Sequence, residues 1–369
     1  MGSVIFITRS VGSVPDSLHC VNDHARSYSP ALVLYDIFPR VEASPPLSPG
    51  DRGTLCPACG SSAARHLISI RYHEIWNGLR DDWGARFSDE VVRRNTPGEE
   101  TSLFECGSCG VHFFDRAVAG DAEFYHALGQ SPKYYSSWKW EFDWVKSRLP
   151  PSAEVLDVGC GSGDFLAAIA PGMRRAVGLD WSPAAVALSR ARGLEAVEGD
   201  LSVRVAGFEG AFDAVCAFHV LEHLPDPVSF LGLLRRCLRP GGSLFLSVPN
   251  RMRSGRASLE PLDCPPHHLT RWSSQSLETL ARRLNLVVVE TATQPVDPSL
   301  PRDRLQRRVR GLAEKIPLGG RFLGAWLPPM AWRVLLSGPL VALYRRLGVL
   351  ERMGFYGLTT VTRCKEPSP

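Results

Sequence analysis

The stretch Val155–Phe165 carries the residues best placed to do chemistry. An apolar run with β-branched residues ends in three alternate glycines at positions 159, 161 and 163, with Asp157 before them and Asp164 after them. The apolar residues 165–170 then predict the start of a helix. A buried strand, a tight turn and a helix N-terminus form the place where α/β sheets hold a nucleotide-like cofactor. Because carboxylates are poor neighbours for phosphates, this turn favours a ligand with positive groups and no phosphate.

This glycine spacing resembles the first motif of class I S-adenosylmethionine (SAM)-dependent methyltransferases. A dinucleotide site would instead show G-x-G-x-x-G around a pyrophosphate. The resemblance implies SAM as the cofactor. It also implies an α/β fold, in which a Rossmann-like seven-stranded methyltransferase sheet carries helices on both faces.

The next two strands supply further cofactor contacts. Residues 175–180 predict a strand that ends in Asp180, which can accept both ribose hydroxyls, and the following Trp181 could lie on the adenine face. Residues 196–201 resemble the third strand of the family, with Asp200 placed to accept the adenine amino group. The predicted cofactor contacts are Asp157, Gly159, Gly161, Gly163, Asp180, Trp181, Asp200, Leu201 and Phe218.

The remaining elements follow in family order. We predict that Ser182 caps a helix whose first residue is Pro183. Apolar residues at helical spacing predict a second helix over 227–238, which the segment Arg-Pro-Gly-Gly at 239–242 ends. The fourth to seventh strands are predicted at 211–218, 243–248, 286–292 and 357–363.

The reacting groups should follow the fourth and fifth strands, at the carboxyl edge of the sheet. Residues 218–225 resemble the "LEH" segment of small-molecule methyltransferases, which include ubiquinone-biosynthesis O-methyltransferases. They lack the (N/D)-P-P-(Y/F) signature of amino-directed nucleic-acid methyltransferases, so we expect no DNA partner. His219, Glu222 and His223 fall on one helical turn, which allows a weak divalent-metal site beside a purely structural role.

After the fifth strand, Pro265 and Pro266 precede the paired His267 and His268. Similar methyltransferases carry a PPHH-like segment in this position. A histidine with a pKa near neutral can deprotonate a hydroxyl, so we predict that His267 or His268 is the general base, with His219 as the next candidate. The alternative is that these histidines only brace the loop. Ser273 is predicted to cap a helix over 277–284.

Four cysteines form two C-x-x-C-G knuckles, at 56–60 and 106–110. Glycine after the second cysteine of each allows the positive φ that turns backbone N–H groups toward sulfur. Two such pairs predict a closed, structural zinc site rather than a catalytic one, against the alternatives of chance pairing or redox chemistry. The predicted zinc ligands are Cys56, Cys59, Cys106 and Cys109.

An aromatic segment separates the knuckles from the glycine turn. Positions 138, 142, 145 and 149 repeat at helical spacing and predict an amphipathic helix that covers the sheet. Tyr134 and Tyr135, just before it, could close over the cofactor.

Composition favours a soluble enzyme with one sizeable core and an accessory domain. The chain has 369 residues, 44% of them apolar, and a formal net charge of +4. No run of 18 apolar residues occurs and the N-terminus is a poor signal peptide, so we expect a cytoplasmic protein. Residues 302–350 are rich in Arg, with Trp326 and Trp332. They predict either a helical lid or an amphipathic hairpin on a membrane surface or a lipid-linked substrate.

The predicted organisation has five parts. These are a loosely ordered extension (1–50), a small zinc-ribbon-like domain (51–125), the SAM-binding core (126–295), a helical Arg/Trp-rich insert (296–352), and the final strand with a tail (353–369). We predict a SAM-dependent methyltransferase with a small-molecule, sugar or lipid-linked glycan acceptor, methylated at oxygen with a histidine base. The alternatives are an RNA methyltransferase that uses the ribbon, a sugar C-methyltransferase, and a binding protein with a degenerate site.

Overall fold

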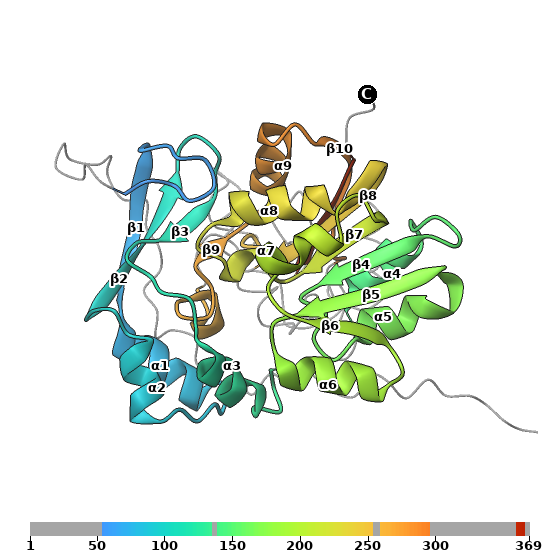
Figure 1. Ribbon diagram of the computed structural model, residues 1–369. Coiled ribbons are helices and arrows are strands. Elements are labelled where there is room, and N and C mark those ends of the chain that lie inside the picture. Colours follow the sequence, from blue (N-terminus) through green and yellow to red (C-terminus); the bar gives the residue numbers. More distant parts are fainter. Residues whose placement is uncertain (1–53, 135–138, 254–258, 296–358, 366–369) are drawn as a thin grey trace, which may run out of the picture. The chain divides into compact units, whose positions relative to one another are not determined.

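Two β-sheets form the framework of the chain in the computed structural model, which describes residues 54–134, 139–253, 259–295 and 359–365 (Figure 1). All of these residues belong to one structural unit, Phe38–Pro369. The predicted extension over 1–50, Tyr135 and the insert over 302–350 lie outside the described residues. Among the described residues, no helix has the length and apolar character needed to cross a membrane.

The larger sheet has seven strands in the order β10-β11-β8-β7-β4-β5-β6. β6, β5, β4, β7 and β8 run parallel, whereas β11 pairs antiparallel with both β8 and β10. This confirms the predicted seven-stranded α/β sheet. Its strands are β4 (Glu154–Val158), β5 (Arg175–Asp180), β6 (Glu195–Glu198), β7 (Phe212–Phe218), β8 (Leu238–Pro249), β10 (Val287–Thr293) and β11 (Thr359–Lys365).

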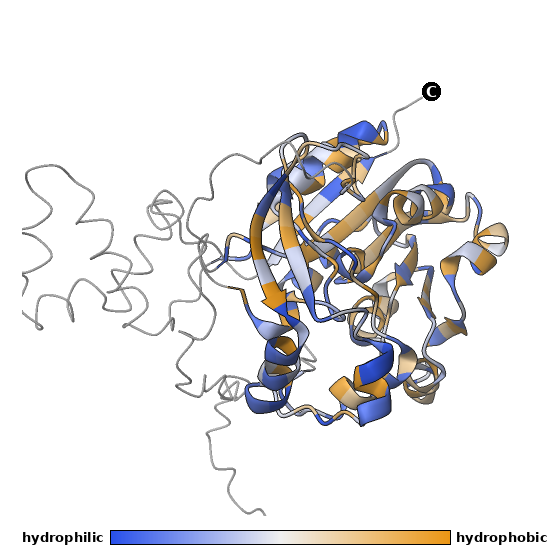
Figure 2. Cartoon of the chain, turned by 90° about the vertical axis from the view of Figure 1, so that its left-hand side faces the viewer, coloured by the Kyte–Doolittle hydropathy of each residue, from blue (hydrophilic) through white to orange (hydrophobic). Residues whose placement is uncertain are grey.

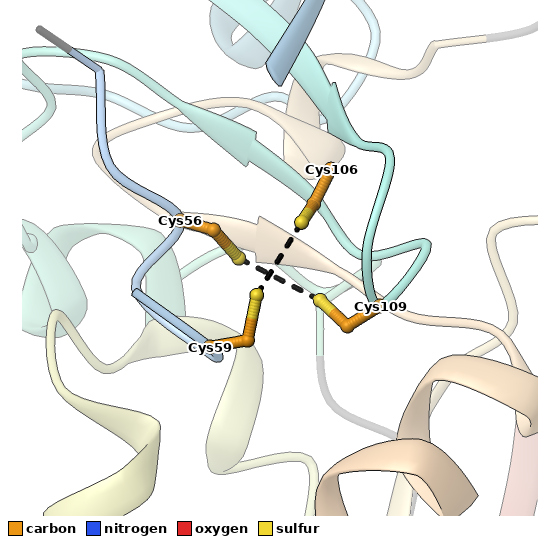
Figure 3. A group of neighbouring side chains, drawn as sticks. All are labelled: Cys56, Cys59, Cys106 and Cys109. Atoms are coloured by element: carbon orange, nitrogen blue, oxygen red, sulfur yellow. Dashed lines mark hydrogen bonds between the residues drawn. The ribbon is translucent and has the colours of Figure 1, made fainter. Parts of the chain in front are cut away.

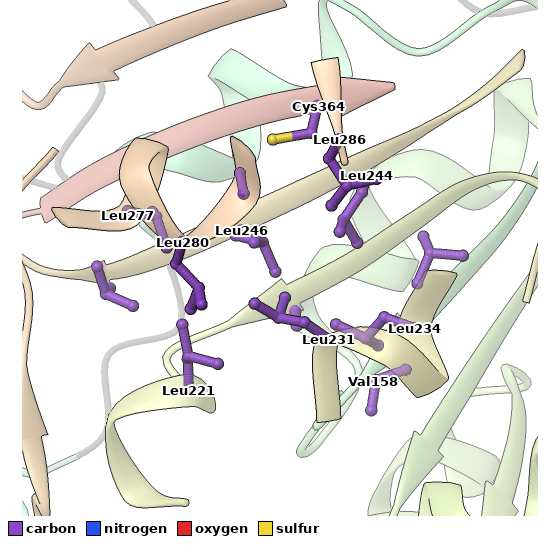
Figure 4. Close-up of a cluster of buried hydrophobic side chains, with 14 of the residues drawn as sticks. Val158, Leu221, Leu231, Leu234, Leu244, Leu246, Leu277, Leu280, Leu286 and Cys364 are labelled. Carbon is purple, nitrogen blue, oxygen red and sulfur yellow. The ribbon is translucent and has the colours of Figure 1, made fainter. Parts of the chain in front are cut away.

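Helices cover both faces because the central strands are apolar on both sides. Neighbouring residues of β4 divide between the faces: Val155 packs with Phe142 and Phe165, and Leu156 packs in the opposite cluster. The first face holds α4 (Trp140–Lys146) and α5 (Asp164–Ile169). The second holds α7 (Leu201–Arg204), α8 (Pro227–Arg236) and α9 (Ser274–Arg283). Figure 4 shows leucines of α8 and α9 beside β8 and β11. α6 (Pro183–Ala191) packs on β5 and β6.

The smaller sheet has the order β1-β2-β3-β9 and is antiparallel throughout. Its first three strands are β1 (Ala64–Arg71), β2 (Glu100–Cys106) and β3 (His112–Phe114), with α1 (Tyr72–Asp81), α2 (Asp89–Arg94) and α3 (Ala122–Gly129) beside them. The fourth strand, β9 (Thr270–Arg271), comes from the segment that follows the paired histidines. It pairs with β3 through Phe113 and Thr270, and the Phe114 N–H donates to the Leu269 carbonyl at 3.0 Å.

Short 3₁₀ turns connect these elements: η1 (Ala170–Gly172), η2 (Val205–Gly207), η3 (Leu221–His223) and η4 (Pro261–Asp263). Figure 2 shows hydrophobic colour along the sheet strands and hydrophilic colour on the outward parts of the helices. The hydropathy of α1 follows this rule, because Tyr72, Ile75, Trp76 and Leu79 are its buried residues.

Local signals predicted most of the boundaries. The Ser182 hydroxyl accepts from the Ala185 N–H and caps α6, which begins at Pro183. Ser273 caps α9 as predicted, but that helix begins at Ser274 rather than at 277. The predicted helix of the aromatic segment is α4, with Phe142 and Val145 buried.

Two other predicted boundaries were also wrong. The third strand ends at Glu198, because Gly199 takes a φ of +143° and Asp200 becomes the N-cap of α7. The helix over 227–238 ends at Arg236, and residues 238–242 belong to β8, where Gly241 has a φ of +76°.

Candidate functional site

The turn between β4 and α5 requires its glycines. Gly159, Gly161 and Gly163 have φ values of +78°, +55° and +81°. A Cβ atom on Gly159 would lie 2.5 Å from Val220 Cγ2, and one on Gly163 would lie 2.5 Å from Ser189 Oγ. Nothing lies within 4 Å of such an atom on Gly161. The turn therefore packs tightly at its two ends and leaves open space at its middle glycine.

Asp157 is a buried carboxylate without a full set of partners. It is 2% exposed, and its Oδ1 has no hydrogen-bond partner among the described residues. Burial raises its pKa to about 7. Because a buried anion without a partner is costly, a cationic ligand group beside it would be stabilising. SAM carries an ammonium group, so Asp157 and the space at Gly161 fit the predicted cofactor.

Asp180 ends β5 and faces the same turn. Its Oδ2 accepts from the Gly161 N–H and its Oδ1 from the Ser182 N–H, both at 2.9 Å. Burial raises the pKa of this carboxyl as well. Each oxygen keeps a further lone pair, so Asp180 can still accept from ligand hydroxyls. Trp181 follows with 50% of its surface exposed, and its ring centroid lies 6.1 Å from that of Tyr125.

The other predicted cofactor contacts are spread more widely. Asp200 is exposed, and its Oδ1 accepts from the Ser202 N–H at 2.7 Å, which fixes it as a helix cap. Leu201 and Phe218 are both buried but lie in different hydrophobic clusters, Phe218 with its ring centroid 4.7 Å from that of Phe165. The structure thus brings Asp157, the glycines and Asp180 together and does not gather Leu201 and Phe218 at one point.

The paired histidines lie in a cluster with His223 of η3. His267 and His268 are buried, with stacked rings 4.2 Å apart, and the His223 ring lies 4.7 Å from His267 and 4.9 Å from His268. Burial lowers the pKa of His223 to about 4 and that of His267 well below its ordinary value. Both rings are therefore neutral near pH 7.

Hydrogen bonds determine which nitrogen of each ring carries the proton. His267 Nδ1 lies 2.8 Å from the Leu262 carbonyl, and His223 Nδ1 lies 2.6 Å from the His267 carbonyl. Because a carbonyl only accepts, both Nδ1 atoms must donate, which leaves the lone pair of each ring on Nε2. The Tyr134 hydroxyl donates to His267 Nε2 at 2.9 Å. Such a nitrogen can take a proton from a substrate hydroxyl.

His219 is held differently from the pair. It has a φ of +55°, and its Nε2 lies 2.6 Å from Glu141 Oε1, while its Nδ1 lies 3.4 Å from Glu222 Oε1. Burial opposes a charge on this ring, but the two carboxylates outweigh burial and raise its pKa. Its ring is engaged by Glu141, so His219 is less free than His267 to act as a base.

The cofactor turn and the histidine cluster share one edge of the sheet. Val220, which follows β7, packs against Gly159. Tyr125 contacts Trp181 with its ring, and its hydroxyl lies 3.0 Å from His223 Nδ1. The carboxyl ends of parallel strands are where such folds bind ligands. Tyr125 thus links the residue that follows β5 to the histidine cluster.

The four predicted zinc ligands converge on one point (Figure 3). The Sγ atoms of Cys56 and Cys109 are 3.6 Å apart, and those of Cys59 and Cys106 are 3.4 Å apart. A tetrahedral site with Zn–S bonds of ~2.3 Å would place them about 3.8 Å apart. Gly60 and Gly110 take φ values of +69° and +72°, which confirms the predicted turn of each knuckle. The cluster could thus hold a zinc ion.

Comparison with known proteins agrees with this geometry. A family model described as a methyltransferase domain matches residues 139–291. This segment is a methyltransferase domain. Together with β11, which lies outside the matched residues, it forms the seven-stranded sheet that the resemblance to class I SAM-dependent methyltransferases predicts.

Curated relatives of the methyltransferase domain include ubiquinone biosynthesis O-methyltransferases. The protein of that name from Xanthomonas oryzae is 40% identical over 116 residues, which cover 30% of this chain and 48% of the relative. That from Xylella fastidiosa is 35% identical over 116 residues, 30% of this chain and 47% of the relative. The chain thus spans about half the length of the curated relatives it matches. A solved SAM-dependent methyltransferase from Archaeoglobus fulgidus is 18% identical with a TM-score of 0.41, over 61% of this chain and 94% of that one.

Three residues of the site gave no clear signal in the sequence. Tyr125 joins the two halves of the site, Glu141 holds His219, and Asp263 lies 3.7 Å from His268 Nδ1. Asp263 also pairs with Arg253 at 2.7 Å, and that arginine helps to lower its pKa well below the ordinary value, although burial opposes the shift. In the sequence, only the position of Glu141, an acidic residue between Trp140 and Phe142, could have indicated a special role for it.

Proposed function

We propose that the chain transfers the methyl group of SAM to a hydroxyl oxygen of a small-molecule acceptor, such as a phenol, a sugar or a lipid-linked glycan. The observation that carries this proposal is the neutral His267, whose Nε2 lone pair lies at the same sheet edge as the glycine turn. The relatives named as O-methyltransferases support transfer to oxygen.

In this proposal one group of residues holds the cofactor and another removes the proton of the acceptor. SAM, when bound, supplies a methyl group on a positively charged sulfur. Asp157 would hold the ammonium group, Asp180 the ribose hydroxyls, and Trp181 the adenine face. His267, with His268 next to it, would remove the acceptor's proton while the oxygen is held in line with the methyl group. Tyr134 would be displaced from His267 when the acceptor enters.

The four cysteines are proposed to bind a structural zinc ion. Its position supports the reacting loop indirectly, because β3 follows the second knuckle and pairs with β9, which directly follows the paired histidines. The Arg251 guanidinium adds to this contact by donating to the Gly110 carbonyl at 3.2 Å.

RNA is a weaker candidate for the acceptor. The arginines around the smaller sheet are matched with acids, including Arg65 with Glu105 and Arg94 with Asp121 and Glu123. A phosphate backbone would have to compete with these carboxylates.

Three further predictions from the sequence are kept as proposals. They are a cytoplasmic location, membrane contact through residues 302–350, and sugar C-methylation as an alternative reaction.

The test is a transfer assay with methyl-labelled SAM and the full chain. The acceptor panel holds catechols and other phenols, nucleotide sugars, lipid-linked glycans and RNA. We expect label on a hydroxyl of one of the small-molecule or glycan acceptors, and a loss of at least tenfold in kcat for His267→Ala. Label found only in RNA would overturn the proposed acceptor class. Full turnover in both His267→Ala and His268→Ala would overturn the proposed base.

A further inference from the structure

We propose that His223, His267 and His268 form a second metal site, distinct from the cysteine cluster, for a divalent transition-metal ion such as zinc. One ring nitrogen from each histidine lies within 4.8 Å of the others. Three nitrogens bound to zinc at ~2.0–2.1 Å in a tetrahedral arrangement lie about 3.4 Å apart. To close this difference the rings must turn toward a common point, and His267 and His268 must leave the stacked arrangement that they have without the ion.

The orientation of two of the rings supports a metal. A histidine that binds a metal through one nitrogen usually donates from the other to a carbonyl or a carboxylate, which fixes the ring. His223 and His267 donate from Nδ1 to backbone carbonyls at 2.6 and 2.8 Å, which leaves the lone pair on Nε2. The Nδ1 atom of His268 faces Asp263 Oδ1 at 3.7 Å, beyond hydrogen-bond distance. His267 Nε2 accepts from the Tyr134 hydroxyl, which a metal ion would have to displace.

Glu222 provides the second, independent observation. Its side chain is 1% exposed, and neither carboxylate oxygen has a hydrogen-bond partner among the described residues. Its Oε1 lies 3.9 Å from His223 Nε2 and 4.0 Å from His268 Nε2, and His219 Nδ1, at 3.4 Å, is outside hydrogen-bond geometry. The neighbouring His219 favours the charge of this carboxylate, but neither oxygen has a hydrogen bond in good geometry. A cation between Glu222 and the ring nitrogens of His223 and His268 would stabilise it further.

The donor set favours the class of ion. Three imidazole nitrogens suit zinc and related transition metals better than magnesium or calcium, which prefer oxygen ligands. With Glu222 balancing the charge of the ion and not binding it, the three histidines would leave room for an outside ligand, as in catalytic zinc sites. If the proposed function holds, an acceptor hydroxyl bound to this ion would lose its proton more readily, and the ion would replace His267 as the means of deprotonation.

Metal binding is measured on the full chain without SAM or acceptor, so the result does not depend on the proposed reaction. The metal-free protein is titrated with Zn²⁺ and, separately, with Co²⁺, and bound metal is counted by elemental analysis. Cysteine ligands give Co²⁺ a thiolate charge-transfer band, which nitrogen and carboxylate ligands do not, so the two sites can be told apart. His223→Ala, His267→Ala and His268→Ala are compared with His73→Ala, an exposed histidine on α1.

We expect two equivalents of metal in the wild type and in His73→Ala, and one equivalent in each cluster variant. The charge-transfer band should be unchanged in the cluster variants, and its presence also shows that they are folded. Cys59→Ser should weaken that band, because it removes one of the four thiolates, and should keep the metal at the histidines. One equivalent in the wild type, or two in all three cluster variants, would overturn the second site. Failure of methyl transfer with two equivalents bound would count against the proposed function alone.

Discussion

The carboxylate of Asp157 should make the cofactor-free protein less stable as pH rises. Burial moves its pKa from 3.8 to about 7. At about 1.4 kcal/mol for each pH unit, this shift corresponds to about 4 kcal/mol. Below about pH 4 the folded and unfolded chains both hold the proton, so the cost is absent. Between about pH 4 and 7 the unfolded chain releases the proton and the folded chain keeps it, and above about pH 7 the full cost applies.

Asp157→Asn removes this ionisation and keeps the shape of the side chain. At pH 8.5 without SAM, we expect the variant to have a free energy of unfolding up to about 4 kcal/mol above that of the wild type, and at pH 4 the two should be close. SAM should narrow this difference in the free energy of unfolding, because the variant lacks the charge proposed to hold the ammonium group. Its Kd for SAM at pH 8 should be at least tenfold weaker.

The assay is urea unfolding followed by tryptophan fluorescence, from pH 4 to 9, with SAM affinity measured by calorimetry. Asp164→Asn is the matched control, because that carboxylate lies at the same turn but pairs with Arg192 at 2.7 Å near the surface. It should show no gain in stability at high pH. The reasoning is refuted if the unfolding free energies of the wild type and Asp157→Asn stay parallel over this range.

Three further predictions follow from the geometry. Gly159→Ala should lower the free energy of unfolding by about 1–3 kcal/mol and weaken SAM binding. The reason is that residue 159 has a φ of +78° and its new Cβ atom would lie 2.5 Å from Val220. Gly161→Ala, where the Cβ atom meets open space, should lose less stability in the same thermal melt. Tyr134→Phe removes the hydroxyl that donates to neutral His267, so the pKa of His267 should rise. The acid limb of the kcat/KM profile should then move to higher pH. An unchanged profile would show that His267 is not the titrating base. Cys59→Ser, which disrupts the proposed zinc site and leaves the histidine cluster intact, should lower methyl transfer more than SAM affinity, since β3 supports the histidine loop and not the glycine turn. Equal losses in the two assays would contradict this.

Sequence reasoning succeeded where the signal is local. The glycine turn, the cap at Ser182 and the two cysteine knuckles each depend on residues a few positions apart, and their backbone geometry follows from residue type. It placed the end of the third strand too late, because a cap and a strand end look alike when Gly199 can take either conformation, whereas the predicted adenine contact of Asp200 stays a prediction.

Contacts between distant parts of the chain could not be read from the sequence. Glu141 and His219 meet only after α4 packs on the sheet, and β9 is a strand of two residues without a periodic pattern. The protonation of His267 likewise depends on the Leu262 carbonyl, whose position is set by η4. These are the features that determine what the histidines can do.

The pairing of β3 with β9 has a consequence for how the chain is made. During synthesis the first three strands of the smaller sheet leave the ribosome long before residues 270–271. Until most of the methyltransferase domain has been made, the backbone groups of β3 that pair with β9 therefore have no partner strand. Open edges pair with other chains and promote aggregation. A fragment cut at residue 125 would keep that edge permanently, so the two sheets are better regarded as one co-folding unit than as separable modules.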